Sequence, residues 1–302
     1  MKNIAIITTA FGNGLPDREK KYAPLAKELG LNIRYCTKEQ LLSHPEGIEG
    51  VIVGVEKADK QLFTCPDLRV AMKFGVGLDN FDLDSAKAAN IQIVNMPGIN
   101  SEAVAEMALA LMLCVTRMIV PMANHLSDGE FIQYCSHSVK GKTIGIIGMG
   151  TIGQKVALKA QAFGMECIGY DVRPFQVEGV SSVDLPYLFS HADVISAHLP
   201  LLPSTFHIIG KEAFAQMKEG VIILNTSRGG IVDDKELYAQ VKKGKVYGAG
   251  LDVFESEETM KELANLPNVI CTPHVSAYTH ETLRLMEETA LRKITTCLAG
   301  AK

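Results

Sequence analysis

Three glycines in the middle of the chain have the spacing that brings a backbone turn close to a phosphate. Gly148, Gly150 and Gly153 form a G-x-G-x-x-G sequence directly after a short apolar run. Gly148 allows a tight turn, Gly150 lets a pyrophosphate approach the backbone, and Gly153 lets the following helix pack close to the strand. The N–H groups at the start of that helix, around Thr151 and Ile152, offer a partial positive charge to the phosphates.

An acidic residue follows at the end of the next apolar run, which predicts how a ribose would be bound. A helical pattern ends near Gly164, a strand pattern covers 166–170, and Asp171 comes next. A carboxylate at this place accepts both ribose hydroxyls of an adenosine and repels a 2′-phosphate, so NAD is preferred over NADP. Arg173 would soften that preference. The competing interpretation is a glycine-rich turn in another α/β protein, such as one that binds a methyl donor.

Three further polar residues each close a predicted strand. Arg228 follows an apolar run, and Asp252 and His274 follow the next two. Ligands of parallel sheets bind outside the carboxyl ends of the strands, so these side chains are candidates for contact with a substrate. The planar guanidinium of Arg228 suits a carboxylate bound through two hydrogen bonds. Asp252 is placed to accept an N–H from a carboxamide, and Pro273 fixes the backbone before His274.

Two carboxylates beyond Asp252 leave an alternative open. Either Glu255 or Glu257 would orient a histidine, and the residues alone do not choose between them. His198, which closes another predicted strand, is a candidate for contact with the cofactor. The remaining histidines are expected to be structural.

The elements that position these residues alternate in a way that predicts an α/β fold with two doubly wound parallel sheets. Short apolar strands separated by helices fill 1–95, without a glycine motif at the first turn, which is typical of a flavodoxin-like domain. A second set follows the glycine motif. The apolar helix expected over 101–120 must be buried, between two domains or between subunits. The last helix, 279–298, is expected to return to the first domain.

Length and composition limit the function further. The chain has 302 residues, enough for two domains, and its 30 basic and 34 acidic residues give a net charge of −4, which argues against nucleic acid as a partner. Seven scattered cysteines without a C-x-x-C pair predict reduced thiols in a cytoplasmic protein, with no metal site. The apolar run 107–115 is far too short to span a bilayer, so no membrane contact is expected.

The order of these motifs resembles that of the D-2-hydroxyacid dehydrogenase family, of the phosphoglycerate dehydrogenase type. The resemblance covers almost the whole chain. The segments that carry it are KFGVGLDNFD (73–82), NMPGINSEAVAEMALALML (95–113), GMGTIG (148–153), NTSRGGIVDD (225–234), LDVFESE (251–257) and TPHVSAYT (272–279).

The resemblance implies a fold and a role for each matching residue. It implies a flavodoxin-like substrate domain, 1–99 and 275–302, into which a Rossmann NAD-binding domain, 100–274, is inserted, and a homodimer formed through the NAD-binding domains. It implies that Arg228 binds the substrate carboxylate, that His274 is the acid and base, and that Glu257, rather than Glu255, pairs with it. Further cofactor contacts would be His198, Leu199, Pro200, Thr226, Ser227 and Asp252, and further substrate contacts Lys73, Val76, Gly77 and Asn100.

These residues together predict reversible hydride transfer between NADH and C2 of a small 2-oxo acid, of the 3-phosphoglycerate type or related. Two other functions stay open. The same fold and cofactor would serve a dehydrogenase of a non-hydroxyacid such as formate or phosphite. A non-catalytic NAD sensor that acts as a co-regulator would bind NADH and convert nothing.

Overall fold

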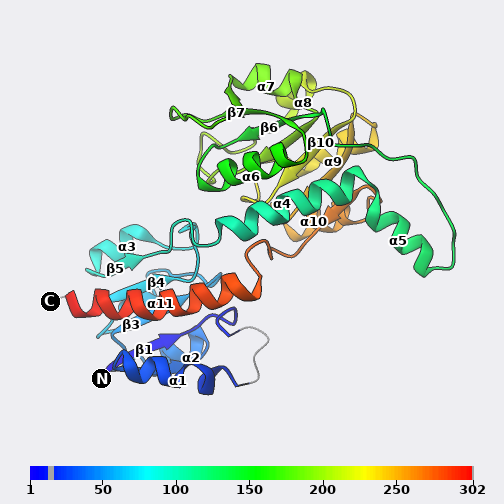
Figure 1. The fold of residues 1–302 in the computed structure, drawn as a ribbon. Helices are drawn as coiled ribbons and strands as arrows, with labels where there is room; N and C mark the ends of the chain where they lie inside the picture. The colour runs from blue at the N-terminus through cyan, green and yellow to red at the C-terminus, as the bar shows by residue number, and fades with distance from the viewer. Residues whose placement is uncertain (13–16, 301–302) are drawn as a thin grey trace. The chain divides into compact units, whose positions relative to one another are not determined.

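The computed structural model describes residues 1–12 and 17–300, and it divides into two compact units (Figure 1). Unit 1 consists of Met1–Asn100 and Tyr278–Lys302, and unit 2 consists of Ser101–Ala277. Residues 301 and 302, the end of the expected segment 275–302, lie outside the described residues. The chain therefore leaves unit 1 once, completes unit 2, and returns.

Unit 1 is built on a five-stranded parallel sheet with the strand order β2-β1-β3-β4-β5, which is the flavodoxin-like order. Alternate side chains of each strand face opposite layers: Ile4 and Ile6 face one core, and Ala5 faces the other. The strands are β1 (Lys2–Ile6), β2 (Leu31–Tyr35), β3 (Gly50–Val53), β4 (Val70–Lys73) and β5 (Gln92–Val94).

Helices cover both faces of this sheet. α1 (Arg18–Glu28) and α11 (His280–Gly300) pack on one face, where α11 contributes Met286, Ala290, Leu291, Ile294 and Leu298 to the core. α2 (Lys38–Ser43), the 3₁₀ turn η1 (Leu62–Thr64) and α3 (Leu83–Ala88) pack on the other. The last helix thus completes the core of unit 1 (Figure 1).

Unit 2 is built on a seven-stranded parallel sheet with the order β12-β11-β10-β9-β6-β7-β8. The order reverses between β6 and β9, as in a Rossmann fold, so the expected fold class is confirmed for both units. The strands are β6 (Thr143–Ile147), β7 (Glu166–Tyr170), β8 (Val180–Ser182), β9 (Val194–Ala197), β10 (Val221–Asn225), β11 (Val246–Leu251) and β12 (Val269–Cys271).

The helices of unit 2 enclose two apolar layers. α4 (Ser101–Thr116) and α6 (Thr151–Ala162) pack on one face of the sheet, while α7 (Leu185–His191), α8 (Lys211–Gln216) and α9 (Asp234–Lys242) pack on the other. α10 (Glu257–Ala264) lies beside α9 and β12. These layers hold the strand ends, and with them the candidate site, in fixed register.

The structure corrects several element predictions. The helix expected over 101–120 ends at Thr116, because Met118 has a left-handed backbone (φ +53°), and α5 (Ile119–Ser127) follows at an angle of 64°. α4 packs against the sheet and α6, so contacts within unit 2 account for much of its burial, and its expected place between domains or subunits stays a prediction. The sequence also has a helical pattern at about 57–64, where the structure has only the 3₁₀ turn η1, and it indicates neither β8 nor α10.

No single helix within residues 1–12 and 17–300 is long and apolar enough to cross a bilayer. Within the described ranges, α4 and α5 are the one pair of helices that together reach the length and composition of a membrane span, and they are bent at the break between them.

Candidate active site

The glycine turn after β6 has the shape that the spacing predicts. A Cβ on Gly148 (φ +96°) would lie 2.4 Å from the backbone oxygen of His198, and a Cβ on Gly153 would lie 2.1 Å from the backbone oxygen of Gly148. Around Gly150, by contrast, a Cβ would meet nothing within 4 Å. Two glycines are therefore required by close packing, and the third leaves open space beside the backbone where a phosphate can approach.

The helix behind this turn offers its amides to an anion. α6 starts at Thr151 with Gly150 at the N-cap position, and no side chain caps its first N–H groups. Asp171, directly after β7, accepts hydrogen bonds from the amides of Met149 (2.8 Å) and Arg173 (2.9 Å), one at each oxygen. Each of its oxygens keeps a second acceptor position, as recognition of two ribose hydroxyls requires.

Two buried polar atoms without a partner lie where the strand order reverses and at the next strand end. They are Nδ1 of His198, after β9, and Oγ1 of Thr226, after β10; neither has a hydrogen-bond partner within the described part of the chain. Burial lowers the pKa of His198 to about 4, so the ring is neutral at pH 7, and its Nε2 lies 2.8 Å from Oγ of Ser196. Buried polar groups normally have partners, so these two atoms fit contacts with a bound dinucleotide.

The other residues expected around the cofactor lie on the same two loops. Leu199 is half-buried against Gly148, Pro200 is exposed, and Ser227 donates its hydroxyl and its amide to Oδ1 of Asn225. The residues present thus fit an NAD cofactor at the carboxyl edge of β6, β9 and β10.

A buried asparagine shapes the loop that carries Arg228, although its place in the sequence assigned it no role. Asn225 accepts the two bonds from Ser227 and donates to the backbone oxygen of Arg228 (2.9 Å). Arg228 donates from Nη1 to the backbone oxygen of Ser227 (2.7 Å). The only signal in the sequence was a polar residue at the end of an otherwise apolar strand.

Asp252 holds the turn that presents His274. Its fully buried carboxylate accepts four hydrogen bonds: from the hydroxyl of Thr272, the amide of Val275, and the amide and hydroxyl of Ser276. His274 has a left-handed backbone (φ +55°), and its side chain is exposed. A carboxylate has about four acceptor positions. The expected bond between Asp252 and a nicotinamide carboxamide stays a prediction, and the turn already occupies those positions.

The structure places the two alternative glutamates differently. Glu255 pairs with a histidine, but this histidine is His207, whose Nε2 lies 2.8 Å from Oε1 of Glu255. Glu257 begins α10 with its side chain 76% exposed, and it accepts a bond from Lys261 (2.6 Å) one turn later. Glu255 is therefore engaged elsewhere, and the pairing of Glu257 with His274 stays a prediction.

The substrate residues expected in unit 1 follow β4. Nζ of Lys73 donates to the backbone oxygen of Gly54 (2.5 Å) and to Oδ1 of Asn80 (2.8 Å). The amides of Val76 and Gly77 donate to no acceptor in the described part of the chain, while Asn95 donates to the backbone oxygen of Val76. Two such amides in one loop suit an anion.

Asn100, the last residue of the first segment of unit 1, also carries an unsatisfied acceptor. Its Oδ1 is buried and has no partner among the described residues. A substrate contact through this atom stays a prediction.

The proteins to which this chain is similar agree with the geometry of the site. The family model "D-isomer specific 2-hydroxyacid dehydrogenase, NAD binding domain" matches residues 109–276. A hydroxypyruvate reductase of Thermotoga maritima is 40% identical over 277 residues, which cover 89% of this chain and 90% of that protein. A D-3-phosphoglycerate dehydrogenase of Methanocaldococcus jannaschii is also 40% identical, over 281 residues that cover 87% of this chain but 52% of that protein.

A solved structure shows the same fold over both units. The D-lactate dehydrogenase of Aquifex aeolicus, in complex with NAD and lactic acid, has a TM-score of 0.83 and 29% identity, and the match covers 99% of this chain and 96% of the other. The glycine turn, the ordered strand-end loops and these matches agree. The chain belongs to the D-isomer specific 2-hydroxyacid dehydrogenase family and is an NAD-dependent oxidoreductase.

Proposed function

We propose that the enzyme interconverts a small, unphosphorylated 2-oxo acid and its D-2-hydroxy acid, with Arg228 as the carboxylate-binding residue and His274 as the acid and base. The observation that carries this proposal is the position of the two residues. Arg228 follows β10 and His274 follows β12, on either side of β11 and at the same edge of the sheet. Neighbouring strands lie about 4.8 Å apart, so the two strand ends are separated by roughly 10 Å, the reach of two side chains around one small molecule.

Each residue would have a defined task. NADH, when bound, supplies the hydride. Arg228 binds the substrate carboxylate and stabilises the negative charge that develops on the carbonyl oxygen, and His274 gives that oxygen its proton. In the reverse direction His274 takes the proton from the hydroxyl group. Glu257 would orient the imidazole, and its present bond to Lys261 would have to open.

We propose that the cofactor is held by residues of five strand-end loops. The residues are Gly148, Gly150, Thr151, Ile152, Gly153, Asp171, His198, Leu199, Pro200, Thr226, Ser227 and, through the turn that its carboxylate holds, Asp252. The unsatisfied atoms of His198 and Thr226 support this set most directly.

The contacts in unit 1 favour a substrate without a phosphate. The amides of Val76 and Gly77 would bind the carboxylate, with Lys73 and Asn100 as further substrate contacts. The ammonium group of Lys73 is held by two neutral oxygens of its own unit, Gly54 O and Asn80 Oδ1. Reorienting it toward a phosphate would cost both bonds, so we expect hydroxypyruvate to be reduced faster than 3-phosphohydroxypyruvate.

A substrate panel followed through the absorbance of NADH tests this function. It would compare hydroxypyruvate, glyoxylate, pyruvate and 3-phosphohydroxypyruvate with NADH and with NADPH, and formate and phosphite with NAD. The variants His274→Gln and Arg228→Lys should lose roughly 10²–10⁴-fold in turnover of the best 2-oxo acid and keep their affinity for NADH. Oxidation of formate or phosphite instead, or NADH binding without any turnover, would refute the proposal.

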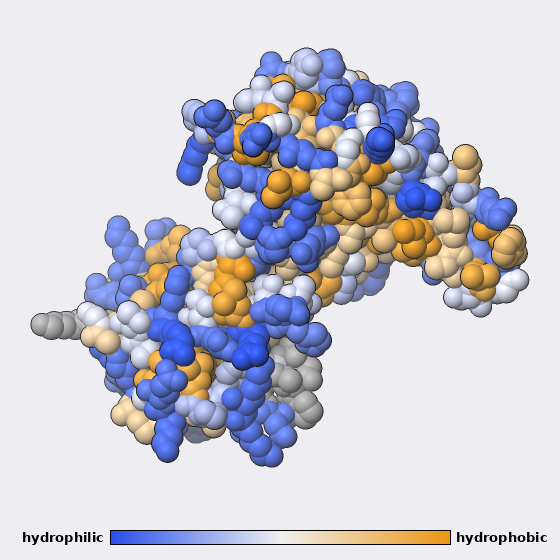
Figure 2. All heavy atoms as spheres, viewed as in Figure 1, coloured by the Kyte–Doolittle hydropathy of each residue, from blue (hydrophilic) through white to orange (hydrophobic). Residues whose placement is uncertain are grey.

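We also propose a homodimer that works in the cytoplasm. In unit 2, α5 and the segment after it expose large apolar side chains, including Leu126 (64% exposed) and Phe131 (83%), and Figure 2 shows apolar residues gathered there. Such a surface fits a second copy of the chain. Light scattering should give twice the mass of one chain. The variant Phe131→Asp should lower the measured mass toward that of a single chain. The seven free thiols support the cytoplasmic location.

A further inference from the structure

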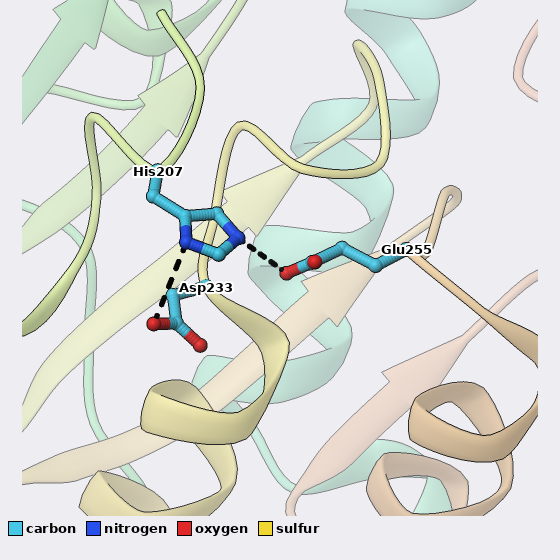
Figure 3. A group of neighbouring side chains, drawn as sticks. All are labelled: His207, Asp233 and Glu255. Carbon is cyan, nitrogen blue, oxygen red and sulfur yellow. Dashed lines mark hydrogen bonds and ion pairs between the residues drawn. The ribbon is translucent and has the colours of Figure 1, made fainter.

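Three side chains from three loops of unit 2 meet near the loop of Arg228 (Figure 3). They are His207, between β9 and α8; Asp233, the N-cap of α9; and Glu255, after β11. Nε2 of His207 lies 2.8 Å from Oε1 of Glu255, and its Nδ1 lies 3.6 Å from Oδ2 of Asp233. Since each ring nitrogen faces a different carboxylate, the imidazole links the loop of His207 to the loops of Asp233 and Glu255.

The loops of His207 and Glu255 enclose the loop of Arg228. On one side, the amide of His207 donates to the backbone oxygen of Gly230 (2.7 Å). On the other side, a Cβ on Gly229 would lie 1.9 Å from the backbone oxygen of Phe254. The residues directly after Arg228 are therefore packed between the backbones of two loops, one carrying His207 and the other carrying Glu255. The bond between these two side chains connects the two loops.

Glu255 has further hydrogen bonds, which it makes with Asp234. Its Oε1 accepts from the amide of Asp234 (3.1 Å), and its own amide donates to Oδ2 of Asp234 (2.8 Å), which also accepts from the hydroxyl of Thr259 in α10 (2.8 Å). Asp234 is almost completely buried. The carboxylate that His207 contacts thus has a fixed position, relative to both α9 and the first turn of α10.

The backbone of His207 indicates that this placement is imposed by its surroundings. Its φ of +51° lies in the left-handed region, which few residues other than glycine adopt, although histidine adopts it more often than most. Its ring stacks on Phe206 with 3.9 Å between the ring centroids. Strain of this kind persists only where neighbouring contacts compensate it, and the bond to Glu255 is one such contact.

We propose that His207 and Glu255 are positioning residues: their bond clasps the two neighbouring loops over the loop of Arg228 and fixes the guanidinium for the substrate carboxylate. This inference rests on the proposed role of Arg228. Because the clasp touches neither the glycine turn nor Asp171, and contacts the loop of Arg228 only at Gly229 and Gly230, its loss weakens substrate binding more than NADH binding.

Two substitutions of the same residue test the clasp. His207→Asn tolerates the left-handed backbone, and its amide reaches only as far as Nδ1, so the bond to Glu255 is lost. His207→Gln places an amide nitrogen at the reach of Nε2 and can restore that bond. We expect His207→Asn to lower kcat/KM for the best 2-oxo acid about tenfold, equivalent to about 1.4 kcal/mol, mainly through KM. His207→Gln should recover most of this loss, with the Kd of NADH within twofold of wild type in both.

A third variant checks that the two residues act as a pair. Because Glu255→Gln removes the charge from the same bond, the double variant His207→Asn/Glu255→Gln should be no worse than His207→Asn alone. Unchanged KM in His207→Asn, failure of His207→Gln to recover activity, or additive losses in the double variant would each overturn the proposal.

Two controls distinguish the clasp from a metal site and from a failure of the proposed function. The candidate ligand atoms of the three residues lie within 4.8 Å of one another, so the melting temperature is also measured with zinc and magnesium. If a metal raised the melting temperature of the wild type but not that of His207→Asn, the three residues would be a metal site instead of a clasp. Full activity of Arg228→Lys would refute the proposed function itself. Loss of activity in Arg228→Lys together with normal kinetics of His207→Asn would refute only the clasp.

Discussion

Replacing Thr226 by valine should make the cofactor-free protein more stable and at the same time weaken cofactor binding. The hydroxyl of Thr226 is buried and has no partner among the described residues. A buried hydroxyl without a hydrogen bond costs about 1–3 kcal/mol, and valine has nearly the same shape. We therefore expect Thr226→Val to raise the free energy of unfolding by about 1 kcal/mol. For a unit of this size that corresponds to roughly 2–4 °C in melting temperature.

The same substitution should have the opposite effect once NADH is present. If the hydroxyl bonds to the dinucleotide, its removal costs about 1 kcal/mol of binding, which is roughly fivefold in Kd. Calorimetry of the cofactor-free protein measures the first effect, and a fluorescence titration with NADH measures the second. Thr226→Ser, which keeps the hydroxyl, should bind NADH almost as well as the wild type.

Another buried threonine of unit 2 provides a matched control. Thr116 is also buried, but its hydroxyl donates to the backbone oxygen of Met112 (2.6 Å). Thr116→Val loses this bond, so it should lower the melting temperature and leave the Kd of NADH unchanged. If Thr226→Val lowered the melting temperature to the same extent and bound NADH normally, the hydroxyl would already have a partner, and the reasoning would be wrong.

Three other substitutions or modifications test further parts of the site. Asp252→Asn puts an amide nitrogen among four donors, so chemical denaturation should show that the free energy of unfolding falls by roughly 2–4 kcal/mol. The value of kcat should also fall, because the turn of His274 loosens. A fully stable variant would contradict the assigned bonds. Gly153→Ala places a Cβ 2.1 Å from a backbone oxygen. It should lower the free energy of unfolding by roughly 1–3 kcal/mol and weaken NADH binding, both measured by calorimetry. Wild-type behaviour would mean that the turn can shift. Burial raises the pKa of Cys271 to about 12, so its thiolate is scarce at pH 8 and becomes common only as the pH rises toward 12. Mass mapping after treatment with iodoacetamide should therefore find the exposed Cys135 labelled first. Equal labelling of the two cysteines at pH 8 would refute the burial of Cys271.

The sequence predicted the parallel sheets and the glycine turn because their signals are local. An apolar run followed by G-x-G-x-x-G and an acidic residue needs no knowledge of distant contacts, and the close packing of Gly148 and Gly153 agrees with it. Element boundaries depended on single backbone angles, such as the left-handed Met118 that ends α4. A methionine gives no sign of that conformation in advance.

The site was less accessible to prediction where contacts cross between loops. The sequence left Glu255 and Glu257 as equal candidates for orienting a histidine, and it offered no reason to choose His207 as the partner of Glu255. Asn225 and Asp234 were missed for the same reason. Each acts through bonds to loops that the sheet brings together, and the spacing of these residues along the chain does not encode that proximity.

The return of α11 to unit 1 has a consequence for the order in which the protein can fold during synthesis. Unit 2 is one uninterrupted segment, so all its residues are synthesised before those of α11. Unit 1 lacks the five core residues of α11 until the whole of unit 2 has been synthesised. Until then α1 covers only part of that face of the sheet in its first hundred residues, and the apolar surface left exposed makes this nascent segment prone to aggregation.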